Sequence, residues 1–272
     1  MNNIYKYISV VFSLFLLLSC EHEMILDLKT AEPHIVIDAA ISENTPCTVL
    51  LTISHSFYDN DSYEKISGAT VILTNDEGIS ETLTEDILDP GNYTSTQIFG
   101  AVGVKYNLKV IIEGETYEAN ATVPTPVPLQ DIHLYEIKAG DKSWYSPSVE
   151  FDDPENEKNY YYFILTVNDK VLQSVYLNDD EFRNGKRIHR ILYFNKEDND
   201  DEELNTGDYV IVEMQTLDYG MYKFYQTWLS YAGGDANPAT NFTGGVLGCF
   251  KAYNASWLTM IVGPEYIYVE NN

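Results

Sequence analysis

A regular alternation of apolar and polar residues between positions 33 and 123 restricts the fold of this chain more than any other feature. Apolar side chains recur at every second position in Ile35–Ile41 and Val49–Ile53, as expected of half-buried strands. Clusters of Asn, Asp, Pro and Gly separate the apolar segments, and Gly supplies the positive φ that tight turns need. These clusters lie at 75–78 and 89–93, and Glu113-Gly114-Glu115 joins the last two apolar segments. Seven short strands at this spacing predict an antiparallel, immunoglobulin-like β-sandwich over residues 33–123.

Three short motifs within residues 66–95 add detail to this prediction. They are Gly68-Ala69-x-Val71, Asp76-x-Gly78 and Gly91-x-Tyr93. Together they resemble the transthyretin-like fold of carboxypeptidase regulatory domains. The resemblance implies that Gly68-Ala69 opens a core strand, that Asp76-x-Gly78 closes a hairpin, and that Tyr93 packs beneath the next strand. It indicates a scaffold and carries no activity.

Residues 124–129 divide the chain into two predicted domains. Pro occupies every second position from Pro124 to Pro128, which favours an extended, semi-rigid linker. Strand patterns resume beyond it and are strongest at Tyr160–Val167 and Asp208–Leu217. We therefore expect residues 130–272 to form a second antiparallel β domain, which closes with strands at 256–262 and 266–269.

One helix is predicted in this second domain, near residues 219–232. Met221, Tyr225, Trp228 and Ala232 follow the spacing of a single helical face. Asp218 can cap the start of the helix, and Gly233-Gly234 can end it. Trp228 is expected to belong to the packed face of this helix.

The first 20 residues indicate the location of the protein. Lys6 precedes an apolar run from Ile8 to Leu18, as in a secretory signal peptide covering residues 1–19. That run is too short to span a bilayer, which needs about 20 apolar residues. The ending Leu17-Leu18-Ser19-Cys20 resembles a bacterial lipobox, which implies cleavage before Cys20 and lipid attachment to it. Residues 20–32 would then form an acidic tether between the lipid bilayer and the fold.

The net charge of −26 argues against nucleic acid as a partner. Nucleic-acid binding depends on basic groups that neutralise phosphates, and this chain has no basic surface of that size. Arg183, Lys186, Arg187 and Arg190 form one basic cluster, but an acidic run lies close by. We interpret the cluster as compensated within the protein.

Motifs for metal binding and catalysis are missing from the sequence. The five His residues show no metal-binding spacing, and no Cys-x-x-Cys is present. The acidic run 198–203 lacks the Gly and distal Glu of a calcium loop. No Gly-x-Ser-x-Gly occurs, although a carboxylate pair formed in space stays open. Cys47 and Cys249 are expected to be buried thiols, with a disulfide as the alternative. We predict no cofactor and no enzyme.

Aromatic and amide side chains give the remaining candidates for a ligand or partner surface. Trp144 and Tyr145 are predicted to lie in a polar loop, where aromatic rings stack on sugars or pack on partners. Asn237 and Asn241 lie in the loop 235–248, which is long for a connection without regular structure. Loops of this length are functional or packed, so these four residues are the candidates.

The mature chain as a whole resembles a family of Bacteroidota lipoproteins known as domain of unknown function 4249. The matching features run in order along the sequence: Cys20-Glu21, Gly68-Ala69-x-Val71, Gly91-x-Tyr93, Tyr117-x-Ala119 to Pro124, Phe151-x-Asp153-Pro154, Asn159-Tyr160-Tyr161, Asn237-Pro238 and Gly244-Gly245-x-Leu247-Gly248-x-Phe250. The resemblance implies an outer-membrane lipoprotein, often encoded beside a TonB-dependent transporter. Glu21 and Glu23 also resemble a surface-export signal. The family offers no catalytic residues to transfer.

These observations lead to one expected function and one alternative. We expect a non-catalytic binding or accessory module, anchored in the outer membrane at the cell surface through Cys20 and serving a TonB-dependent transporter. The alternative is a structural or adhesive surface lipoprotein, whose loss would change attachment and leave nutrient uptake unchanged.

Overall fold

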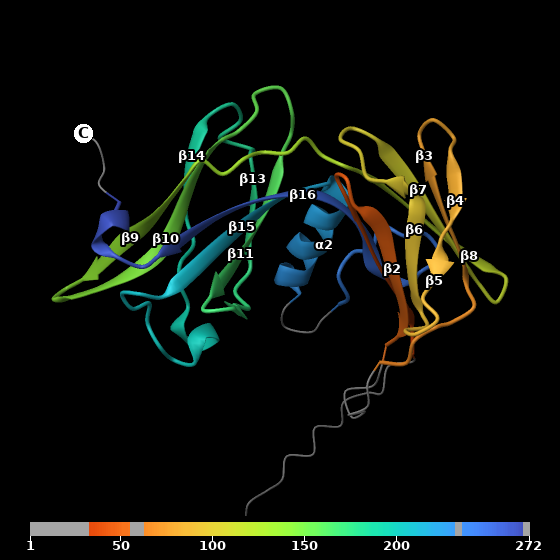
Figure 1. The fold of residues 1–272 in the computed structure, drawn as a ribbon, viewed down its shortest axis with the longest axis horizontal. Coiled ribbons are helices and arrows are strands. Elements are labelled where there is room, and N and C mark those ends of the chain that lie inside the picture. Colours follow the sequence, from red (N-terminus) through yellow and green to blue (C-terminus); the bar gives the residue numbers. More distant parts are fainter. Residues whose placement is uncertain (1–32, 55–62, 232–235, 269–272) are drawn as a thin grey trace, which may run out of the picture. The chain divides into compact units, whose positions relative to one another are not determined.

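Figure 1 shows the computed structural model, which describes residues 33–54, 63–231 and 236–268. All of these residues belong to one unit. The predicted signal peptide, Cys20 with its acidic tether and the glycine pair at 233–234 lie outside the described residues. The described chain is mainly β, as predicted, with α2 (Tyr219–Ser230) as its single α-helix.

The longest sheet has the strand order β12-β11-β15-β16-β1-β2-β6-β5, with β13 also paired to β11. Its strands are β1 (Ile35–Ser42), β2 (Pro46–Ile53), β5 (Thr84–Glu85), β6 (Asn92–Phe99), β11 (Tyr160–Val167), β12 (Lys170–Val171), β13 (Tyr176–Asp179), β15 (Tyr209–Leu217) and β16 (Leu247–Ile261). Neighbouring strands pair antiparallel, except that β1 and β16 run parallel. That parallel pair departs from the expected antiparallel arrangement.

Two smaller sheets complete the β structure. One has the order β4-β3-β7-β8 and contains β3 (Thr70–Asn75), β4 (Ser80–Thr82), β7 (Lys105–Ile112) and β8 (Glu115–Thr122). The other has the order β14-β10-β9 and contains β9 (Asp131–Ala139), β10 (Lys142–Asp152) and β14 (Arg187–Ile191). Two short 3-10 helices, η1 (Lys196–Asn199) and η2 (Pro264–Tyr266), lie in connections.

The buried apolar residues form two large clusters, each between two sheets. In the first, β1, β2, β6 and the start of β16 pack against β3, β7 and β8. In the second, β11, β15 and the end of β16 pack against β9, β10 and β14. We call these the first sandwich and the second sandwich.

β16 belongs to both sandwiches. Its residues 247–253 pair with β1, and its residues 253–261 pair with β15 (Figure 1). Phe250 is fully buried in the first core, and Met260 is buried in the second. Fifteen strand residues extend over about 50 Å, which is long enough to cross both. The sequence predicted a strand only at 256–262, so its first half was missed.

The Pro-rich segment 124–129 lies where the two cores divide. Its backbone is held by β16, because Asn254 Nδ2 donates to the carbonyl of Pro124 at 2.6 Å and Ser256 Oγ accepts from the N–H of Leu129 at 2.9 Å. Val127 and Leu129 are buried in the second core. The segment is therefore a packed element of the fold. The division into domains at residues 33–123 and 130–272 stays a prediction.

The hairpins of the first sandwich follow the predicted turns. Gly78 has a φ of 82° in the β3–β4 turn, and Gly114 has a φ of 92° between β7 and β8. Tyr93 is buried, and its hydroxyl accepts a hydrogen bond from the N–H of Ala69 at 3.0 Å. The Tyr of the Gly-x-Tyr motif thus packs beneath the segment that opens β3, as the resemblance implied.

Two local predictions in the second sandwich were wrong. Trp144 and Tyr145 lie within β10, where Tyr145 pairs with Glu136 of β9, and not in a polar loop. The strand expected from Tyr266 is replaced at its start by η2, because Pro264 suits the first turn of a helix. Ile267 keeps only an isolated bridge to Leu134.

Candidate functional site

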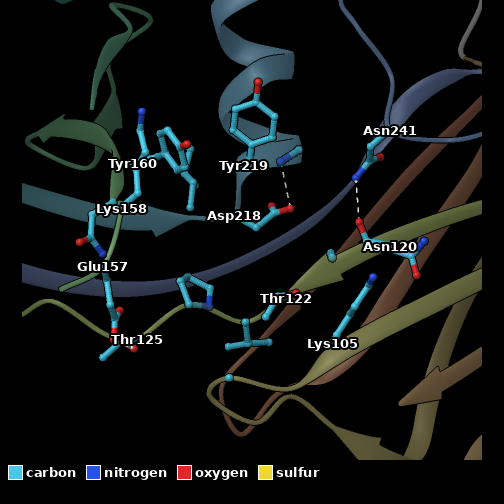
Figure 2. Close-up of a pocket in the computed structure, with 17 residues that line it drawn as sticks. Lys105, Asn120, Thr122, Thr125, Glu157, Lys158, Tyr160, Asp218, Tyr219 and Asn241 are labelled. Carbon is cyan, nitrogen blue, oxygen red and sulfur yellow. Dashed lines mark hydrogen bonds between the residues drawn. The ribbon is translucent and has the colours of Figure 1, made fainter. Parts of the chain in front are cut away.

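A cleft of about 760 Å³ lies where the end of β8, the Pro-rich segment, the start of β11 and the start of α2 meet (Figure 2). Its walls come from five separate stretches of the chain. The lining includes Gly103 and Lys105, residues 120–125, residues 157–160, residues 217–220, and Asn241. Polar side chains and tyrosine rings make up most of this lining, so the cleft can offer both hydrogen bonds and stacking surfaces.

Asp218 fixes the start of α2 above the cleft. Its carboxylate accepts hydrogen bonds from the N–H groups of Gly220 at 3.1 Å and Met221 at 3.4 Å, as a helix N-cap does. It also accepts from the N–H of Ala252 at 3.2 Å, which ties the helix to β16. Burial raises the pKa of Asp218 to about 6, although these N–H groups act in the opposite direction. The carboxylate is thus occupied by the fold.

Asn241 has a similar structural task on the opposite wall. Its Oδ1 accepts from the N–H of Phe250 at 2.9 Å, and its Nδ2 donates to the carbonyl of Phe250 at 2.8 Å. The side chain therefore satisfies both backbone groups of a β16 residue. A longer contact of 3.5 Å joins Nδ2 to the carbonyl of Asn120, shown as a dashed line in Figure 2.

Tyrosine rings form the third wall. Tyr160 stacks on Tyr222 with ring centroids 4.4 Å apart and lies 5.6 Å from Tyr219. Tyr219 is 58% exposed, so its ring is open to a partner. The hydroxyl of Tyr222 donates to Asp179 at 3.1 Å, and burial with this neighbouring carboxylate raises its pKa to about 12. The rings of Tyr160 and Tyr219 line the cleft and offer contact surfaces.

Lys105 and Lys158 are the basic residues of the cleft, and Figure 2 shows them on either side of Thr122. Neither forms an ion pair with another of the described residues. The Lys158 ammonium lies 5.8 Å from the centre of the Tyr160 ring. The carboxylate of Glu157 accepts from the hydroxyl of Thr125 at 3.1 Å. Both ammonium groups thus remain available to a partner.

The four candidate residues from the sequence are not brought together. Asn241 lines the cleft, whereas Asn237 is exposed in the loop that leads to it. Tyr145 lines a different pocket of about 270 Å³ with Leu134 and Leu204. Trp144 points to the other face of β10, since successive strand residues alternate in direction.

The loop carrying Asn237 and Asn241 is packed along much of its length. Thr243 exchanges hydrogen bonds with Glu118 of β8, and Phe242 and Val246 are buried in the first core. A Cβ on Gly244 would lie 2.7 Å from the ring of Tyr117, so this turn fits closely against β8. The described part of the loop therefore serves mainly to cover an edge of the fold.

Lys105, Lys158, Tyr160 and Tyr219 were missed as candidates. Each looks like an ordinary strand, helix or loop residue in the sequence, because the cleft exists only after distant segments meet. The motif Asn159-Tyr160-Tyr161 was the one signal available, and it was used only for the family resemblance.

The structure also describes the cysteines, the possible metal ligands and the basic cluster that the sequence analysis considered. Cys47 and Cys249 are free, buried thiols, and burial raises the pKa of Cys47 to about 12. Among the described residues no cluster of His, Cys, Asp and Glu could hold a metal ion. Arg187 of the basic cluster pairs with Asp131, Glu150 and Asp152, whereas no ion pair among the described residues includes Arg183, Lys186 or Arg190. No helix in the described part is long and apolar enough to cross a membrane.

Comparison with known proteins gives one family match. The model of the family described as "Domain of unknown function (DUF4249)" matches residues 21–257. No curated protein matches the sequence. Among solved structures, a DUF4785 family protein from Legionella pneumophila aligns with 9% identity and a TM-score of 0.28, covering 70% of this chain and 53% of its own. The chain thus spans about half of that protein.

A second solved structure, the chicken interferon gamma receptor alpha chain, aligns with 10% identity and a TM-score of 0.21. The alignment covers 70% of this chain and 91% of the receptor chain. At these TM-scores neither structure bears on what this chain does.

Proposed function

The chain belongs to the DUF4249 family, and we propose that it is a Bacteroidota outer-membrane lipoprotein that acts as a non-catalytic binding module for a TonB-dependent transporter. The cleft beside α2 is the observation that carries the binding role. Its two best-placed acceptor groups, Asp218 and Asn241, are engaged in holding the backbone. The groups left for a partner are ammonium groups and tyrosine rings, which bind and position rather than react.

The anchoring part of the proposal depends on the first 32 residues. The lipobox-like ending Leu17-Leu18-Ser19-Cys20 supports lipidation of Cys20, and several acyl chains on one residue hold a protein firmly in a bilayer. Glu21 and Glu23 support display at the cell surface. The N-terminal sandwich, with its Gly68-Ala69 and Gly91-x-Tyr93 motifs, is proposed to be of the transthyretin-like type.

A mild-detergent affinity purification from the native host tests the transporter role. The protein carries a C-terminal tag, and a Cys20→Ser variant serves as the control for membrane attachment. We expect stoichiometric recovery of an outer-membrane transporter with the unaltered protein, and intact-mass analysis showing acylated Cys20. Recovery of the acylated protein alone would rule out a stable transporter complex.

A structural or adhesive role is the second candidate, and one surface feature favours it. Trp257 and Ile261 are 64% and 58% exposed on β16, and Tyr209, which pairs with Ile261, is 41% exposed. Exposed apolar side chains of this size commonly mark a contact surface. Deletion of the gene would then reduce attachment of cells to a surface, and nutrient uptake would be unchanged.

A further inference from the structure

The floor of the cleft is an open sheet edge. β8 is the outer strand of the sheet β4-β3-β7-β8, and its residues Asn120 and Thr122 line the cleft. An outer strand presents N–H and C=O groups that can pair with another strand. Both residues are exposed.

Hydrogen bonds at the end of β8 show which backbone groups face outward. The N–H of Val123 donates to the carbonyl of Val104 at 3.2 Å, and its carbonyl accepts from Gly103 at 2.8 Å. Val123 therefore faces β7. Because alternate residues of a strand point their backbone groups to opposite edges, Thr122 and Asn120 face away from β7. Within the described residues, the N–H groups of Asn120 and Thr122 and the carbonyl of Thr122 have no hydrogen-bond partner.

The next outward-facing residue along β8 already pairs with an added segment. The carbonyl of Glu118 accepts from the N–H of Thr243 at 2.8 Å, and the N–H of Glu118 donates to the hydroxyl of Thr243 at 3.1 Å. The loop leaves the edge after this contact, and only the 3.5 Å contact from Asn241 reaches the carbonyl of Asn120. The edge of β8 can thus pair with another segment, and no described segment is paired with this edge at Asn120 and Thr122 inside the cleft.

The charges around this edge indicate which kind of segment would bind there. Lys105 and Lys158 line the same cleft and have no carboxylate partner among the described residues, in a chain whose net charge is −26. The carboxylates of Glu157 and Asp218 are engaged by Thr125 and by backbone N–H groups. Two available cations beside an open strand edge complement an extended segment that carries acidic residues.

We propose that the cleft binds an extended, acidic peptide segment of a partner protein, which pairs as an added strand with Asn120 and Thr122 of β8. Main-chain hydrogen bonds supply the affinity in this mode of recognition, and side-chain pockets supply the specificity. Here Lys105 and Lys158 contact the acidic side chains, and Tyr219 contacts the neighbouring residues. This assignment rests on the proposed binding function and names the chemistry of the partner at the same cleft.

The first test measures peptide binding to the purified chain by fluorescence polarisation at low salt. The probes are two labelled decapeptides, one of alternating Glu and Thr and the other of alternating Lys and Thr. We expect saturable binding of the acidic peptide, with protection of the Asn120 and Thr122 amides from hydrogen exchange. Absence of binding at millimolar peptide, or protection elsewhere on the chain only, would overturn the proposal.

A Thr122→Pro variant tests the hydrogen bonds. Proline removes an outward-facing N–H and leaves the ladder to β7 intact, so an edge position tolerates it. We expect the acidic peptide to bind at least about tenfold more weakly, since one hydrogen bond is lost and the next is blocked by the ring. The matched control is Thr116→Pro, an outward-facing position on the same strand that does not line the cleft. Equal losses in both variants would contradict the assignment.

Charge reversal tests the choice of an acidic segment. Lys105→Glu with Lys158→Glu should weaken binding of the acidic peptide about tenfold at low salt, and less at high salt. Lys142→Glu is the control, because Lys142 is an exposed lysine at the β9–β10 hairpin and outside the cleft. Half of this loss on a logarithmic scale in the Lys142→Glu protein would mean that net charge alone governs binding, because one reversal changes the charge by half as much as two.

Two further results separate this inference from the transporter role. If Thr122→Pro still recovers the transporter in full and still binds the acidic peptide, the accessory function holds and strand addition is wrong. If the unaltered protein recovers no transporter but binds the acidic peptide at β8, strand addition holds for another partner. A gain in peptide affinity on deleting residues 21–32 would make the acidic tether of the chain itself the occupant, and would overturn the assignment to a partner.

Discussion

The two sandwiches share β16 but use it differently. In the first sandwich β16 runs parallel to β1, and in the second it runs antiparallel to β15. In the first sandwich the β3–β4 and β7–β8 hairpins close through glycine turns, whereas in the second α2 stands between β15 and β16 in the chain order. The comparison shows that main-chain pairing along one strand, rather than a linker, connects the two parts.

A substitution where β16 enters the first sandwich should lower the free energy of unfolding more than the other changes below. Gly248 has a φ of 94°, and a Cβ there would lie 2.1 Å from the carbonyl oxygen of Ile37 on β1. We expect Gly248→Ala to lower the free energy of unfolding by about 4 kcal/mol or more, because backbone must move. Urea unfolding followed by circular dichroism measures this loss.

Gly245 supplies the matched control for that substitution. Its φ is also left-handed, at 77°, but a Cβ there would contact nothing within 4 Å. Gly245→Ala should therefore cost only the backbone strain, about 1–2 kcal/mol. Equal effects of the two substitutions would mean that the β1–β16 contact is not what makes Gly248 necessary.

Two core phenylalanines test whether the sandwiches unfold together. Phe250 of the first core and Phe163 of the second are both fully buried. Each change to Ala should cost about 3–5 kcal/mol. Because β16 is common to both cores, we expect either variant to show a single calorimetric transition at a lower temperature. Two separate transitions in the Phe163→Ala protein would show that the first sandwich is stable by itself.

Buried carboxylates should give the two sandwiches opposite pH responses. Burial acts to raise the pKa of Glu81 in the first sandwich, but hydrogen bonds from Thr96, Ile98 and Gln97 lower it overall. In the second sandwich, burial raises the pKa of Asp153 although Tyr161 donates to it. The Glu81 contribution to stability is therefore present above pH 4.5 and is lost as the pH falls. The Asp153 contribution is present below pH 3.8 and is lost as the pH rises through its folded pKa.

Urea titrations between pH 7 and pH 3 measure this difference. The stability gap between the unaltered protein and Glu81→Gln should shrink on acidification, and the gap to Asp153→Asn should grow. Gaps that move in the same direction for both variants would contradict the contrast between the two carboxylate sites.

Surface ion pairs should produce the smallest difference in stability between variants of the two sandwiches. Arg187 in the second sandwich contacts Asp131 and Glu150 at 2.8 and 2.6 Å, whereas Lys109 in the first sandwich meets Glu118 at 3.6 Å. Arg187→Ala should lower the melting temperature more than Lys109→Ala, because a network of charges outweighs one exposed pair. Repeating both measurements in 1 M salt should remove most of the gap.

The sequence predicted the parts of the fold that local chemistry determines. The hairpin at Gly78, the packing of Tyr93 and the helix capped by Asp218 all depend on residues close together in the chain. The first half of β16 could not be recognised in this way. Its partner β1 is more than 200 residues away, and Gly248 within it reads as a loop residue.

The candidate site was even harder to predict from local sequence, because it is built from residues far apart in the chain. Asn241 was identified because it lies in an unusual loop, and Trp144 and Tyr145 were misplaced because Lys142 and Ser143 look like loop residues. The cleft depends on how β8, the Pro-rich segment and α2 meet. Nothing in the local pattern around Lys105 or Lys158 indicates that meeting, so periodicity alone could not find them.

The position of β16 in the chain order has a consequence for biosynthesis. Among the described strands, β16 follows all the others, yet it supplies a central strand to each sandwich. While the polypeptide is still being made, β1 and β15 each lack a neighbour that the finished sheet provides. Neither sandwich can complete its sheet until residues 247–261 have been added. Early translation products should therefore stay protease-sensitive and free of stable tertiary structure.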